Sequence, residues 1–64
     1  MIQDVDERLE QLSRVLQRAI DQLLFAEDTH TCMASVCDPI LVEIREAQAR
    51  VAALRLRLEA VRDE

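Results

Sequence analysis

Apolar residues recur along this chain in alternating steps of three and four residues. This spacing places the residues on one side of an α-helix and is typical of a helix that packs against another helix. The pattern runs through two segments, and we call its members the apolar series. They are Ile2, Val5, Leu9, Leu12, Leu16, Ala19, Leu23 and Ala26, then Ile40, Ile44, Ala47, Val51, Leu54, Leu58 and Val61. The sequence therefore predicts an all-α fold of two long, coiled-coil-like helices.

The residues between these segments predict a bend. Pro39 is the only proline of the chain. A proline inside a helix removes a hydrogen bond, whereas at the first helical position it is well tolerated, and Asp38 before it is a good N-cap residue. We therefore expect one domain, residues 1–64, with a first helix over about 2–28, a bend over about 29–37 and a second helix over about 38–63. The apolar series also continues through His30, Met33 and Cys37, so a single kinked helix is the alternative.

The charges of the two segments favour an antiparallel hairpin over that alternative. Asp4, Asp6, Glu7 and Glu10 stand near the start of the first segment, and Arg50, Arg55, Arg57 and Arg62 stand near the end of the second. An antiparallel hairpin places the acidic start beside the basic end. Asp6 and Arg62 both flank the apolar series, where ion pairs select helix orientation. The sequence predicts that these two residues pair.

Composition excludes several classes of function. The chain has 64 residues, a net charge of −5 and eight basic residues that are all arginine. A basic stripe for nucleic acid is missing, and an anionic membrane surface would be repelled. No run approaches the ~20 apolar residues of a membrane span, and the acidic start does not resemble a signal peptide. We therefore expect a cytoplasmic protein that binds neither nucleic acid nor membrane.

The second segment carries further apolar residues on the side away from the apolar series. We call this set the outer stripe: Val42, Ala49, Ala53, Leu56 and Ala60. A helix in a lone hairpin should be polar on that side. The outer stripe is either ordinary surface, since alanine favours helices, or an interface. We expect an interface, in a dimer of hairpins that forms a four-helix bundle or in contact with a helical protein partner.

The bend holds the residues that could carry chemistry. His30, Cys32, Cys37 and Asp38 are candidate metal ligands, but their H-x-C-x4-C spacing is not that of a zinc finger. Because we expect the protein to lie in a reducing compartment, we expect Cys32 and Cys37 to be free thiols, with a Cys32–Cys37 disulfide as the alternative. The chain has no glycine and hence no phosphate-binding loop, and a hairpin of this size should enclose no ligand pocket. We expect no enzyme activity and no cofactor.

Part of the chain resembles a known family. The run VDERLEQLSRVLQRAIDQLL, followed by SVCDPIL, is similar to the dimerisation helix and metal loop of the mercury-responsive (MerR) transcriptional regulators. The resemblance covers Val5 to Leu41 and implies a dimer with a metal-binding loop. The chain departs from that pattern because Asp38 stands between Cys37 and Pro39, Ala26 lies where the first loop cysteine should fall, and a long second helix follows.

These patterns predict a small non-enzymatic module for protein–protein interaction or assembly, acting through coiled-coil packing of helices. The alternative is a metal- or thiol-responsive regulatory element that uses His30, Cys32 and Cys37 in the bend.

Overall fold

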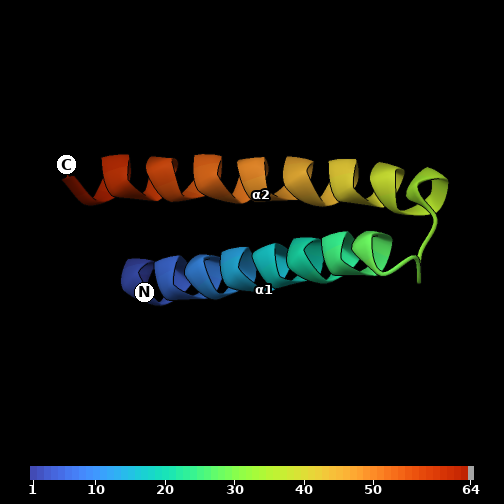
Figure 1. Cartoon of the computed structure of the whole chain (residues 1–64). Helices are drawn as coiled ribbons and strands as arrows, with labels where there is room; N and C mark the ends of the chain where they lie inside the picture. The colour runs from blue at the N-terminus through green and yellow to red at the C-terminus, as the bar shows by residue number, and fades with distance from the viewer. Residues whose placement is uncertain (64) are drawn as a thin grey trace.

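The protein is a hairpin of two helices. The computed structural model describes the backbone of residues 1–63 and the side chains of residues 1–62, so that Glu64 of the expected domain lies outside the described part. Helix α1 spans Ile2–Asp28 and helix α2 spans Ala34–Asp63. They run antiparallel, with both chain ends opposite the bend, in a rod of 49 × 16 × 12 Å (Figure 1). The predicted all-α hairpin is confirmed, and the single kinked helix is wrong.

The end of α1 is closed by backbone hydrogen bonds that turn the chain. The N–H of Thr31 donates to the carbonyl oxygen of Ala26 at 2.8 Å, and the N–H of His30 donates to that of Glu27 at 3.1 Å. His30 itself has a positive φ of 58°. This is the Schellman arrangement, whose left-handed position usually holds glycine. Histidine takes that position here in a chain without glycine, which gives His30 a structural role at the bend.

Helix α2 begins four residues earlier than the sequence predicted. The N–H groups of Val36 and Cys37 both donate to the carbonyl oxygen of Met33, each at 2.9 Å, so the first turn forms before Asp38. Asp38 is therefore not the N-cap, and Pro39 lies inside the helix. The prediction failed because cap and proline preferences describe where a helix can begin, whereas here the turn that carries Cys37 into the core is also helical.

The contact between the helices, which we call the seam, differs from the predicted one by a rotation of each helix. The seam residues, spaced three and four apart and all buried or half-buried, are Asp6, Leu9, Ser13, Leu16, Ile20, Leu23 and Glu27 of α1 and Cys37, Leu41, Ile44, Gln48, Val51, Arg55 and Leu58 of α2. Next to seam residues in the sequence, Glu10, Ala19, Ala26 and Ala47 are half-buried as well. Only alternate members of the apolar series are among the seam residues. At 100° per residue, each helix is turned by about 50° from the orientation that would centre the apolar series on its partner.

Polar contacts across the seam fix this rotation and the register of the helices. Asp6 pairs with Arg62 at 3.7 Å, as predicted, and also accepts a hydrogen bond from Nε of Arg55 at 3.1 Å. Halfway along the rod, Nε2 of Gln48 donates to Oε1 of Gln17 at 3.0 Å. These contacts require polar side chains in or beside the seam, and they turn apolar positions away from it.

Neither of the two helices, over the residues that the structure describes, is long and apolar enough to cross a membrane.

The position of Pro39 inside α2 predicts that Pro39→Ala stabilises the fold. The substitution restores an N–H that can bond to the carbonyl of Ser35 and removes the ring from that carbonyl. Allowing for the greater freedom of the unfolded chain, we expect a gain of about 1–2 kcal/mol in the free energy of unfolding, measured by urea denaturation. Asp38→Ala is the control, because it would cost about 1 kcal/mol if Asp38 were the N-cap. A loss of stability in both variants would contradict a helix that begins at Ala34.

Candidate functional site

More large apolar side chains are exposed than buried in this hairpin. The buried apolar residues of the described chain are Ile20, Cys37, Leu41 and Val51. The exposed large ones are Met1, Ile2, Val5, Leu12, Val15, Leu24, Phe25, Met33, Val36, Ile40, Val42, Leu54, Leu56 and Val61. Scattered exposed apolar residues are normal on a protein surface, whereas a contiguous set indicates a contact surface. The arrangement of these residues is therefore the main functional observation.

One side of the hairpin collects the apolar series that the seam leaves out. Each of these residues immediately precedes a seam residue or, at the open end, Arg62. In an antiparallel pair such positions lie on the same side of the two helices. We call them the open face: Val5, Leu12, Ala19 and Ala26 of α1 with Ile40, Ala47, Leu54 and Val61 of α2. Its five large side chains are between 42% and 57% exposed. The open face is thus apolar along both helices, with five exposed large side chains and three half-buried alanines.

The opposite side of the hairpin has a different character. The equivalent positions there immediately follow seam residues or, at the open end, Ile2. They hold Gln3, Glu10, Gln17 and Leu24 of α1 and Asp38, Arg45, Ala52 and Glu59 of α2. Most are polar or charged, as expected of a surface in water. The contrast between the two sides shows that the apolar content of the open face is not a general property of this hairpin.

The outer stripe lies where the sequence placed it, on the back of α2 away from α1. All five of its residues are exposed, with Val42 at 54% and Leu56 at 67%. A shallow hollow lined by Arg50, Ala53, Leu54 and Arg57 joins the outer stripe to the edge of the open face. The exposure leaves these residues accessible to a partner but does not test the predicted association.

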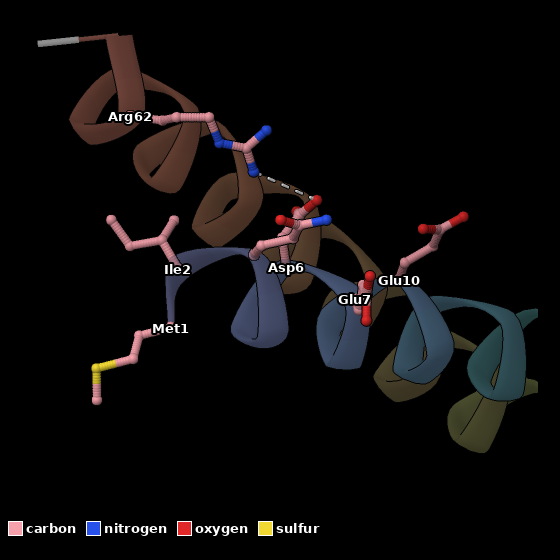
Figure 2. A pocket seen from close by; sticks show the side chains of 7 residues that line it. Met1, Ile2, Asp6, Glu7, Glu10 and Arg62 are labelled. Carbon is pink, nitrogen blue, oxygen red and sulfur yellow. Dashed lines mark ion pairs between the residues drawn. The ribbon is translucent and has the colours of Figure 1, made fainter.

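The open end of the hairpin forms a wide, shallow hollow. Figure 2 shows the Asp6–Arg62 pair within it, with Met1 and Ile2 at the start of α1 and Glu7 and Glu10 further along. The lining combines the apolar Met1 and Ile2 with the acidic Asp6, Glu7 and Glu10, and the hollow is open to solvent. The hydrogen bond with Asp6 raises the pKa of Arg55, which lies deeper between the helices. This end is held by the ion pairs of Asp6 with Arg55 and Arg62.

The bend is closed by a disulfide between Cys32 and Cys37, whose Cα atoms lie 6.4 Å apart. The expectation of free thiols is therefore wrong, and the alternative disulfide is present. It forms because the early start of α2 carries Cys37 into the core, fully buried, directly beside the loop that holds Cys32. The bond joins a loop residue to the first turn of α2 and thereby fixes the bend.

The candidate metal ligands of the bend are not brought together. Both sulfurs are in the disulfide, and His30 serves as the left-handed residue that ends α1. Among the described residues, no group of three or more His, Cys, Asp or Glu side chains is placed to hold a metal ion. Asp38 instead lies near Glu27, a contact that the sequence analysis missed because the two residues meet only when α2 begins before Asp38.

The environment of Glu27 disfavours its charge. Burial, a hydrogen bond with Asp38, and the negative charges of Asp38 and Asp28 all raise the pKa of Glu27 above its usual value. The carboxyl group therefore holds its proton to higher pH in the folded chain than in the unfolded chain. The charge of Glu27 at neutral pH is therefore unfavourable at the bend.

Comparison with known protein families, curated proteins and solved structures finds no match.

The raised pKa of Glu27 predicts a specific pH dependence of stability. Between the unfolded and folded pKa values of this group the native state binds more protons, so stability falls as pH rises through the region just above 4.5. Glu27→Gln should melt at a higher temperature than the wild type at pH 7, and the difference should shrink as pH falls toward 4. Glu46→Gln, at an exposed position, is the control. An equal effect of both substitutions at every pH would contradict this account.

The disulfide predicts that reduction weakens the hairpin without removing its helices. Closing so short a loop in the unfolded chain is worth about 2 kcal/mol in the chain-entropy treatment. A phosphine reductant should therefore lower the melting temperature of the wild type, measured by circular dichroism, while helix content at low temperature persists. The variant Cys32→Ser with Cys37→Ala should not respond to the reductant. Unchanged melting, with thiol titration showing that the disulfide is open, would refute a stabilising role.

Proposed function

We propose that this protein is a small, non-enzymatic interaction and assembly module that acts by packing its exposed helical surfaces against other helices. The observation that supports the proposal is the excess of exposed over buried large apolar side chains, gathered on the open face and the outer stripe. Fully burying one large apolar side chain contributes about 1.5–3 kcal/mol, so covering these partly exposed surfaces in an assembly would add stabilisation that the seam alone does not supply.

The size of the seam supports the same proposal. Chains of this length seldom build a sufficient core alone and usually add a disulfide, a metal or self-association. The disulfide at the bend acts at one end of the rod and leaves the other end to the partly buried ion pairs of Asp6 with Arg55 and Arg62, whose contribution solvent screening reduces. A dimer of hairpins in a four-helix bundle, or a complex with a helical partner protein, would supply the missing burial. The outer stripe is a second surface proposed for such contacts.

A second candidate function follows from the disulfide. Cys32 is half-buried in the loop, whereas its partner sulfur belongs to the fully buried Cys37. In the cytoplasm, the location proposed from the sequence, a disulfide would be reversible. An external dithiol would reduce it to two thiols and become a disulfide itself. The protein would then act as a thiol-responsive element in which the bend loosens on reduction.

The proposed assembly function predicts that mass and melting temperature depend on concentration. Light scattering should give a mass above the 7.4 kDa of one chain at tens of micromolar. The melting temperature should rise with protein concentration because assembly binds only the folded chain. The disulfide variant Cys32→Ser with Cys37→Ala serves as a control, and the thiol-responsive candidate predicts that its assembly differs from that of the wild type. A monomer with concentration-independent melting up to the millimolar range would contradict assembly by self-association.

A further inference from the structure

We propose that the open face binds a second copy of this chain, packed face to face with the two bends at opposite ends, so that two hairpins form a four-helix bundle. This inference rests on the proposed function and names the surface, the partner and the arrangement. The outer stripe lies outside this contact, on the back of α2.

The rotation of the helices in the hairpin favours a four-helix bundle. The seam contains polar residues at positions such as Asp6, Ser13 and Gln48, whereas every position of the open face is apolar. A lone hairpin gains most when its most apolar side faces the partner helix. In a bundle the most apolar side of each helix instead points toward the common axis, between two neighbouring helices. The observed rotation is the one that a bundle requires.

The volumes of the facing side chains favour a dimer with the two bends at opposite ends. The register set by Gln17 and Gln48 brings Leu12 level with Leu54 and Ala19 level with Ala47. A two-fold axis perpendicular to the helices, through the middle of the hairpin, places Leu12 against Ala19 of the second copy and Leu54 against Ala47 of the second copy. Val5 likewise faces Ala26 of the second copy, whereas Val61 faces Ile40, a pair of two large side chains. Alternation of large and small residues across facing positions is what a densely packed core needs.

The other face-to-face arrangement packs poorly. A two-fold axis parallel to the helices, with both bends at the same end, would put Leu12 and Leu54 of both copies into one layer. The next layer would then hold Ala19 and Ala47 of both copies and leave a void among four alanines. Voids of this kind are destabilising in proportion to their volume. Side-chain volume therefore selects the arrangement with bends at opposite ends.

The charges at the outer edges of the open face favour the same arrangement of the two copies. The edge residues are Met1, Arg8, Val15 and Gln22 on α1 and Val36, Glu43, Arg50 and Arg57 on α2. With the bends at opposite ends, Glu43 of each copy faces Arg57 of the other copy, so this pair occurs twice per dimer. Arg50 of one copy lies beside Arg50 of the other copy at the two-fold axis. With bends at the same end, Arg57 would face Arg8 of the second copy. The two favourable pairs support the same arrangement that volume selects.

The first test places a charge at the centre of the open face. Leu12→Glu and Leu54→Glu should each raise the dimer dissociation constant, measured by sedimentation equilibrium, by at least about a hundredfold, because a carboxylate would be buried without a partner. Leu56→Glu, the same change on the outer stripe of α2, is the matched control and should leave the constant unchanged. Dissociation by Leu56→Glu alone would overturn the open face as the association surface while keeping the proposed function.

The second test changes exposed residues at the edges of the open face, so that the seam of each hairpin keeps its side chains and the variants can fold as the wild type does. Glu43→Arg and Arg57→Glu should each weaken the dimer several-fold, and the double swap should restore the wild-type constant. In the arrangement with bends at the same end, Arg57→Glu would instead face Arg8 and strengthen the dimer, which would overturn the proposal. A wild type that stays monomeric at millimolar concentration would overturn both this inference and assembly through self-association.

Discussion

The rotation of each helix about its own axis is the constraint on which the rest of this structure depends. Asp6 accepts from Arg55 and pairs with Arg62, and Gln48 donates to Gln17, so polar side chains occupy part of the space between the helices. These contacts hold α1 and α2 about 50° away from the orientation that would bury the whole apolar series in the hairpin, given a 100° step per residue. The seam is consequently small, and one side of the rod remains apolar.

The bend, like the seam, is stabilised by few interactions. A chain without glycine uses His30 for a left-handed turn, and the hydroxyl of Thr29 donates to the carbonyl of Phe25 at 2.9 Å near the end of α1. The disulfide then fixes the start of α2, where Pro39 and the Glu27–Asp38 carboxyl pair act against stability. The hairpin is thus covalently fixed at one end and held by partly buried ion pairs at the other. Such a unit gains strongly from any partner that covers its apolar side.

The sequence predicted the elements of this fold and their direction but not how the helices face each other. Spacing of apolar residues identified both helices, and the charges at the ends correctly paired Asp6 with Arg62. The same spacing could not show which side of the apolar series α2 would cover, since two neighbouring orientations share Leu9, Leu16 and Leu23. Ile20 and Leu41, both buried, lie outside the apolar series for that reason. Cap preferences at Asp38 and Pro39 likewise gave no indication of the extra helical turn or of the disulfide that depends on it.

The account centres on one claim, that the apolar series of this chain is shared between two copies. The most direct measurement is an isotope-filtered nuclear Overhauser experiment on a mixture of labelled and unlabelled protein, which detects contacts between different chains only. We predict intermolecular signals between the methyl groups of Leu12 and Ala19 and between those of Leu54 and Ala47. Intermolecular signals confined to Val42 and Leu56 of the outer stripe, or none at a concentration where the protein is assembled, would contradict the claim.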